Sequence, residues 1–197
     1  MAPLNPEQVK KIVSVKNILE RAQHFTDVPW QAVAAVWYRE SFSIASPITP
    51  GGPFQFDPRP PVLILGDWLV VYAGLNPDSK SDSIIMHNLC TGGVNDFACA
   101  AIFAACWLCH QCRYSLKIDH SDVAIKDAFY GYNGRAWGPH PESSPYVYNN
   151  FDLLHTNMTI RGSIPDPHSK TGRRFISMID RRPGAFTVYR QLIDEKV

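Results

Sequence analysis

The segment from Asp96 to Leu116 constrains the fold most, because apolar side chains cover nearly every side of it. Its length and composition predict one helix, and a helix that is apolar all round has to be buried by other elements. The longest apolar run inside it, Phe97 to Cys109, is too short to span a bilayer. We therefore expect a buried helix inside a globular domain.

Five cysteines gather in and around this segment: Cys90, Cys99, Cys106, Cys109 and Cys112. The last three, with His110 among them, have a spacing that occurs in metal and iron–sulfur sites. On one continuous helix, this spacing places the thiols on adjacent turns and does not wrap them around one ion. Cysteine is also a common small residue of protein cores. We expect reduced, packed thiols; a metal site and a disulfide are the competing interpretations.

The composition describes a globular protein with substantial loops. Hydrophobic residues make up 45% of the 197 residues and charged residues 19%, with 16 prolines and 12 glycines, and this length fits a single domain. The formal net charge of +1 gives no general attraction to nucleic acid or acidic membranes. The first residues lack the basic and apolar regions of a signal peptide. We expect synthesis in the cytoplasm, no nucleic-acid partner and no stable membrane insertion; the oligomeric state stays open.

Apolar residues at helical spacing dominate the chain. Asn5 and Gln8 are typical of a capping box, and Pro6 suits the first turn of a helix whose apolar pattern runs to Leu19. Pro29 begins a second helix. The other expected elements are a helix or strand at 62–75, a polar loop at 76–83, a helix from Ser121 or Asp122 to Tyr132, a short helix at 146–154, an irregular or hairpin segment at 161–175, and a last helix from about Pro183 to Ile193.

Glu40 is the candidate acid. It continues the apolar face formed by Val33, Val36 and Trp37, and a loop rich in glycine and proline follows it. A carboxyl in such a place is expected to be partly desolvated, which raises its pKa and lets it hold a proton near neutral pH. An ordinary surface glutamate, paired with Arg39, is the competing interpretation of this residue alone.

Short motifs around Glu40 occur in a particular order along the chain: Val28-Pro29, Glu40-Ser41, Gly52 to Gln55, Gly131-Tyr132-Asn133 and Ser144-Pro145-Tyr146-Val147. In this order they resemble the motifs of soluble lytic transglycosylases and goose-type lysozymes, over about residues 25–150. The resemblance implies a mainly α, lysozyme-like helical domain with loop-rich insertions, whose central helix carries the cysteines. We expect one domain over residues 1–197, with 155–197, which has no counterpart in the family, packed on it as a C-terminal extension. Pro53 and Phe54 depart from the family's pattern, and residues 58–94 exceed its minimum length.

The resemblance also implies a function: cleavage of the β-1,4 bond between N-acetylmuramic acid and N-acetylglucosamine in peptidoglycan, with Glu40 as general acid and base. The residues it implies for substrate binding are Ser41, Phe54, Gln55, Tyr132, Asn133 and Tyr146. Glycosidases usually pair two carboxylates, yet no second acid lies between Glu40 and Gln55. Asp57 is the nearest candidate, although an Asp-Pro turn explains it equally well.

A site with one acid suits catalysis assisted by the substrate's own N-acetyl group. Attack by the sugar's 6-hydroxyl would then give a 1,6-anhydro product, as in a lytic transglycosylase, whereas attack by water would make the protein an N-acetylmuramidase. No cofactor or metal is expected. Without a signal peptide, such an enzyme would be released at lysis or carried in a virion, as a bacteriophage endolysin is. A non-catalytic glycan-binding virion protein, a chitinase or chitosanase, and a thiol–metal protein also stay open as functions.

Overall fold

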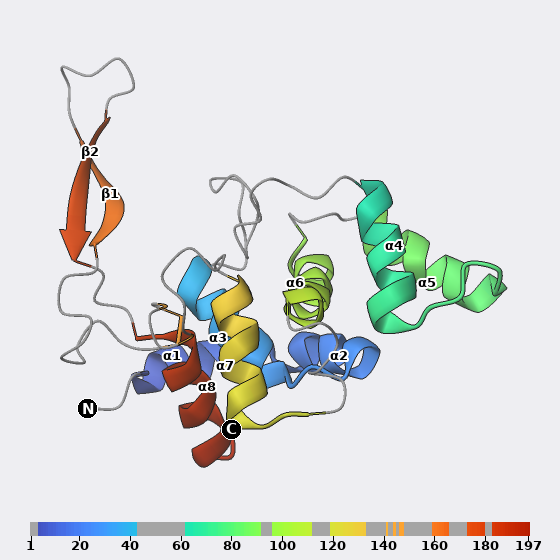
Figure 1. Cartoon of the computed structure of the whole chain (residues 1–197), viewed down its shortest axis with the longest axis horizontal. Helices are drawn as coiled ribbons and strands as arrows, with labels where there is room; N and C mark the ends of the chain where they lie inside the picture. Colours follow the sequence, from blue (N-terminus) through green and yellow to red (C-terminus); the bar gives the residue numbers. More distant parts are fainter. Residues whose placement is uncertain are drawn as a thin grey trace.

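The computed structural model of the protein describes residues 4–42, 62–91, 96–111, 119–132, 141, 144, 146–147, 159–165, 173–179 and 183–197. Within these residues the chain forms eight helices and one two-stranded sheet (Figure 1). Their bounds are α1 (Pro6–Ser14), α2 (Lys16–Thr26), α3 (Trp30–Glu40), α4 (Val62–Ala73), α5 (Lys80–Thr91), α6 (Phe97–Gln111), α7 (Asp122–Tyr132), β1 (Thr159–Pro165), β2 (Arg173–Ile179) and α8 (Ala185–Asp194). The predicted mainly α class is confirmed.

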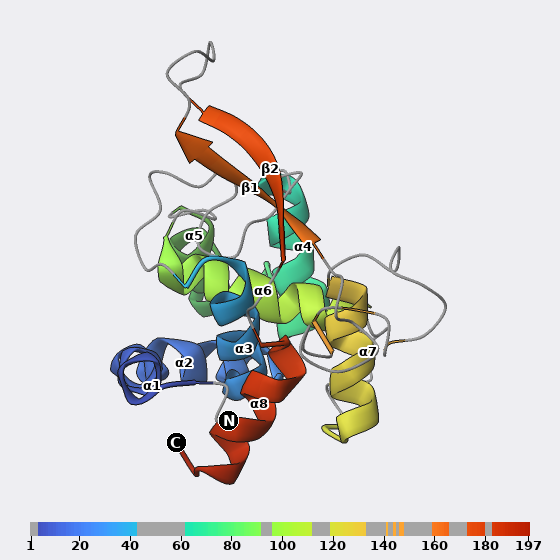
Figure 2. The same cartoon turned by 90° about the vertical axis from the view of Figure 1, so that its left-hand side faces the viewer.

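The apolar segment that constrained the fold forms α6. Its side chains are buried at Phe97, from Cys99 to Cys106, and at Leu108 and Cys109. Helices α2, α3, α4, α5 and α7 all contact it, and Figure 2 shows it running across the molecule among them. The prediction of a buried helix is confirmed over Phe97–Gln111, while its expected last turns, at 112–116, lie outside the described residues.

A second helix, α3, is buried on all its sides. Trp30 and every residue from Ala32 to Arg39 are buried, and helices α2, α6 and α8 contact it. Alanine at 32, 34 and 35 keeps the helix narrow, which lets neighbouring helices approach its backbone closely. Helices α3 and α6 together therefore form the centre of the core.

The capping box predicted at the first helix is confirmed. The Asn5 side chain accepts a hydrogen bond from the Gln8 backbone at 2.9 Å, and the Gln8 side chain accepts one from the Asn5 backbone at 2.9 Å. The single helix expected to run on to Leu19 is wrong, because the chain breaks at Val15, whose φ is −116° and ψ is 8°. There the Val15 amide bonds to Ile12 O, three residues back, so the turn tightens and α2 starts anew.

The structure decides the open prediction for one segment between α3 and α6 and corrects the prediction for another. The apolar stretch at 62–75 is helical, as α4, and Gly74 with a φ of 67° follows its end. The polar loop expected at 76–83 is wrong from Lys80 onwards, where α5 begins. Ser79 explains the difference, because its side chain accepts a hydrogen bond from the Asp82 backbone at 3.4 Å and so caps the helix.

The C-terminal part adds a hairpin and a helix. The irregular or hairpin segment is a hairpin in which β1 and β2 pair antiparallel, from Thr159 opposite Ile179 to Pro165 opposite Arg173. The predicted last helix is confirmed as α8, which packs against α3 and α7. The Gln191 side chain on α8 accepts a hydrogen bond from the Leu4 backbone at 2.8 Å, which holds the residues before α1 against α8.

The short helix expected at 146–154 is wrong at its first two residues. Tyr146 and Val147 lie in a turn, in which the Val147 amide bonds to Ser144 O at 3.0 Å and the Tyr146 amide bonds to the Ser144 hydroxyl at 3.2 Å. The serine side chain thus competes for a backbone amide and favours a turn over a helix. Residues 148–154 lie outside the described residues.

Three of the cysteines have their side chains in the core. Cys99, Cys106 and Cys109 are buried and form no disulfide, and the Cys109 thiol lies 3.8 Å from Thr26 O of α2. In the part of the chain that the structure describes, no group of His, Cys, Asp or Glu is placed to hold a metal ion. The side chain of Cys90 and the whole of Cys112 lie outside the described residues. The three cysteines with described side chains are therefore packed thiols.

None of the described helices combines the length and the apolar character needed to cross a membrane.

Replacing core residues of α6 tests this packing. We expect Cys106→Ala to lower the free energy of unfolding by roughly 1 kcal/mol, and Phe103→Ala by about 3–5 kcal/mol, because the larger side chain leaves the larger cavity. Chemical denaturation of the two variants and the parent measures both values. Stoichiometric zinc or iron in the parent that is lost from Cys106→Ala would contradict the packing account.

Candidate active site

Glu40 is the last residue of α3 and is half-buried. The residues of α3 that precede Glu40 lie in the core, where α2, α6 and α8 pack around them. The neighbouring Arg39 is only 3% exposed. The carboxyl of Glu40 is therefore carried on a rigid element and stands where that element leaves the core, which is how a precisely held functional group is usually presented.

The end of α3 is fastened to α1. The backbone amides of Ser41 and Phe42 both bond to Trp37 O, at 3.2 and 2.9 Å, and Phe42 has the left-handed φ of 49° that ends many helices. The Lys11 ammonium of α1 donates a hydrogen bond to Phe42 O and lies 4.2 Å from the centre of the Phe42 ring. A cation at this position also suits the negative end of the helix dipole. These contacts hold the turn that follows Glu40.

Two tyrosines from distant parts of the chain complete the site. The Tyr146 hydroxyl donates a hydrogen bond to Oε1 of Glu40. Its ring stacks on that of Tyr132, with ring centres 6.0 Å apart and an angle of 24° between the planes. Tyr132 is the last residue of α7 and Tyr146 lies in the turn after Ser144. Figure 1 shows the C-terminal ends of α3 and α7 on the same side of the molecule.

Both tyrosines have raised pKa values, although Tyr132 is only partly buried. Loss of solvent is the largest cause that raises the pKa of Tyr132 and of Tyr146 well above 10.0, and the negative charge of Glu40 raises both further. The positive charge of Arg39 lowers the pKa of Tyr146 and so opposes this rise; the Arg39 guanidinium carbon lies 5.6 Å from the centre of the Tyr146 ring. At neutral pH, Glu40 is therefore next to neutral phenol groups, which are hydrogen-bond donors.

Of the residues predicted for the site, the structure brings Glu40, Tyr132 and Tyr146 together. Ser41 is half-buried and serves as the C-cap of α3. The four other predicted residues lie outside the described residues: Phe54, Gln55, Asp57 and Asn133. Arg39 was not among the predicted site residues, although a charged residue within the apolar run of α3 is a signal that could have identified it.

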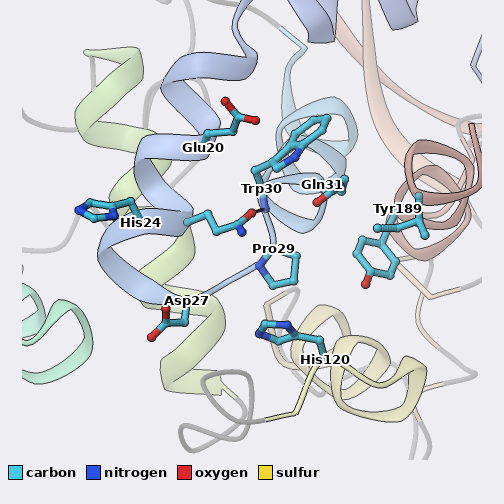
Figure 3. A pocket seen from close by; sticks show the side chains of 10 residues that line it. Glu20, His24, Asp27, Pro29, Trp30, Gln31, His120 and Tyr189 are labelled. Atoms are coloured by element: carbon cyan, nitrogen blue, oxygen red, sulfur yellow. Dashed lines mark hydrogen bonds between the residues drawn. The ribbon is translucent and has the colours of Figure 1, made fainter. Parts of the chain in front are cut away.

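A separate hollow lies at the other end of α3 (Figure 3). It has a volume of about 720 Å³ and polar side chains around it. The residues that line it are Glu20, Gln23, His24, Asp27, Pro29, Trp30, Gln31, His120, Tyr189 and Ile193. None of the predicted site residues is among them, so this hollow and the Glu40 site are different places on the molecule.

Comparisons with protein-family models, with curated proteins and with solved structures gave no match.

The raised pKa values of the tyrosines predict a loss of stability at alkaline pH. At a pH between 10.0, the ordinary pKa of tyrosine, and the higher pKa values of Tyr132 and Tyr146 in the folded state, the folded protein binds more protons than the unfolded chain. The free energy of unfolding should therefore fall as the pH rises above 10.0. Denaturation curves from neutral pH to about pH 11 measure this slope, and Tyr146→Phe should make it shallower. An equal slope in Tyr146→Phe would contradict the assignment.

Proposed function

We propose that this protein cleaves the glycan strands of peptidoglycan, as a lytic transglycosylase of lysozyme-like fold, with Glu40 as general acid and base. The observation that carries the proposal is the hydrogen bond from Tyr146 to Glu40, with Tyr132 stacked on Tyr146. These three residues come from three of the motifs that resemble the family, and 106 positions separate Glu40 from Tyr146. If the motifs resembled the family only by chance, there would be no reason for residues from three of them to contact one another.

The contact with Tyr146 suits both halves of acid–base catalysis. While Oε1 accepts the Tyr146 hydrogen bond, we assign the proton of the acid form to Oε2, which would donate it to the glycosidic oxygen. After the transfer, the same hydrogen bond stabilises the carboxylate that remains. Tyr146 is therefore proposed as a positioning residue that orients Glu40 and stays neutral throughout.

One carboxyl suffices if the substrate supplies the nucleophile. The N-acetyl carbonyl oxygen of the muramic acid attacks the anomeric carbon, while the bond to the departing sugar breaks and that sugar's oxygen takes the Glu40 proton. The Glu40 carboxylate then removes the proton of the 6-hydroxyl, whose oxygen attacks the anomeric carbon and releases the N-acetyl oxygen. The product is a 1,6-anhydro sugar, and Glu40 has its proton back. Tyr132 and Asn133 are proposed to orient the N-acetyl group.

The arrangement of helices supports the same proposal. The resemblance implied a central helix that carries the cysteines, and α6 is buried and contacts five other helices. A protein that only binds glycan needs no acid held at the end of a core helix. The tyrosine contact with that acid therefore favours an enzyme over a silent binding protein.

The variant Glu40→Gln tests the proposal directly. We expect a fall of about 10²–10⁴-fold in the rate at which purified peptidoglycan is solubilised, because glutamine keeps the shape and loses the proton. The melting temperature should stay nearly unchanged, because Glu40 is half-buried and glutamine can still accept from Tyr146. Clearing of a peptidoglycan suspension measures the rate.

Glu20→Gln is the matched control, because Glu20 is an exposed glutamate at the separate hollow. It should clear the suspension at the parental rate. A Glu40→Gln variant that keeps most of the activity would remove this residue from the mechanism.

A further inference from the structure

Three aromatic rings form a stack where α4 crosses α6. The His110 ring lies 5.7 Å from that of Trp68 and 5.5 Å from that of Trp107, with angles of 19° and 26° between the planes. The two tryptophan rings are 5.0 Å apart, centre to centre, at 33°. Trp68 comes from α4, and the other two rings come from the last turns of α6. We call these three residues the Trp68–Trp107–His110 stack.

The stack is held rigidly and is still open to solvent. The buried Tyr72 hydroxyl is hydrogen-bonded to Nδ1 of His110, and the Tyr72 ring stands nearly perpendicular to the histidine ring, at 86°. Both tryptophans are only half-buried and His110 is exposed, although most of α6 is buried. Rings that are already ordered lose little conformational freedom when a ligand covers them.

The chemistry of the stack fits a neutral, amphipathic ligand. Besides His110, the sequences of α4 and α6 contain one acidic or basic residue, Asp67, so no cationic cluster is present in these helices to bind phosphate or an acidic polymer. The aromatic rings offer apolar surface, while the indole N–H groups offer donors. With Nδ1 occupied by Tyr72, Nε2 is the histidine nitrogen that can bond a ligand; among the described residues nothing bonds to it. A sugar ring has the matching properties, an apolar C–H face and a rim of hydroxyl groups.

A series of contacts connects the stack to the Glu40 site. Gln111, one helical turn after Trp107, packs closely on Gly131 of α7, where a Cβ would come within 2.7 Å of the Gln111 Cβ. Tyr132, which stacks on the tyrosine bonded to Glu40, directly follows Gly131. Figure 2 shows α4 beside the end of α6 that lies toward α7. A glycan strand is a long polymer, so an enzyme that cleaves it can bind sugars on both sides of the cleaved bond.

We infer that the Trp68–Trp107–His110 stack is a sugar-binding subsite, which takes an N-acetylhexosamine ring of the glycan strand at a distance from the cleaved bond. The choice of the glycan rests on the proposed function, whereas the preference for a neutral sugar ring rests on the stack itself. The subsite would hold the strand in place while Glu40 acts, and binding energy from such remote sugars can assist the reaction.

Binding without cleavage tests the inference. In the Glu40→Gln background, the protein is titrated with a soluble β-1,4-linked pentamer of N-acetylglucosamine, and its tryptophan fluorescence is followed. We expect Trp107→Leu to weaken binding by roughly tenfold or more, because a stacking surface is lost. His110→Ala changes an exposed side chain and should weaken binding severalfold. His120→Ala, an exposed histidine at the separate hollow, is the matched control and should bind like the background.

Each outcome decides one claim. If Trp107→Leu and His110→Ala are folded and bind the pentamer like the background, or if the background itself does not bind it, the inference is overturned. Should Trp107→Leu fail to fold, His110→Ala alone decides. If Glu40→Gln still solubilises peptidoglycan while both variants lose binding, the proposed catalytic role is wrong and the subsite stands. If Glu40→Gln is inactive and the variants bind normally, the proposed catalytic role stands and the subsite is wrong.

Discussion

Helices α2, α6 and α8 surround α3 so completely that the side chains from Ala32 to Arg39 are all buried. The other elements depend on this packing, since α6 and α8 have their own apolar faces covered partly by α3. The same packing explains the place of Glu40. A helix that is held by the core on all sides can present a carboxyl only at its end, and that end is where Lys11 of α1 fastens the turn after Glu40.

The hydrogen bond between Tyr146 and Glu40 connects this core to the C-terminal half of the chain. Its donor stays a neutral phenol, since burial and the charge of Glu40 both raise the pKa of Tyr146. A carboxyl with a fixed neutral donor on one oxygen is suited to give and take a proton through the other. On the proposed function, the aromatic stack at the end of α6 would bind the strand at a distance from the reacting sugars.

Local sequence signals predicted most of the helices, but they did not decide between helix and strand at 62–75 and did not predict α5. The capping box at Asn5 and the apolar spacing after Pro29 each correspond to an observed helix start. The errors arose where a side chain or backbone competes locally for a hydrogen bond. Examples are the tight turn at Val15, the cap by Ser79 that starts α5 inside the expected loop, and the turn at Ser144 in place of a helix.

The resemblance named Glu40, Tyr132 and Tyr146 as candidate site residues, but neither the hydrogen bond between Tyr146 and Glu40 nor the stacking of the two tyrosines was predicted. No periodicity relates Glu40 to Tyr132 or Tyr146, because tertiary packing decides which residues distant in the chain meet. The stack of Trp68, Trp107 and His110 shows the same limit. Each ring alone is typical of a core residue, and only the crossing of α4 and α6 brings the three together.

Mass spectrometry of the fragments released from purified peptidoglycan, by the parent protein and by Asp57→Asn, tests the central claim most directly. The account predicts fragments that end in 1,6-anhydro-muramic acid from both proteins, because the substrate and Glu40 supply all the reacting groups. Fragments with reducing ends, together with an inactive Asp57→Asn, would contradict the transglycosylase mechanism and indicate a hydrolase with two carboxylates. Glycan strands left intact by the parent protein would contradict the proposed cleavage altogether.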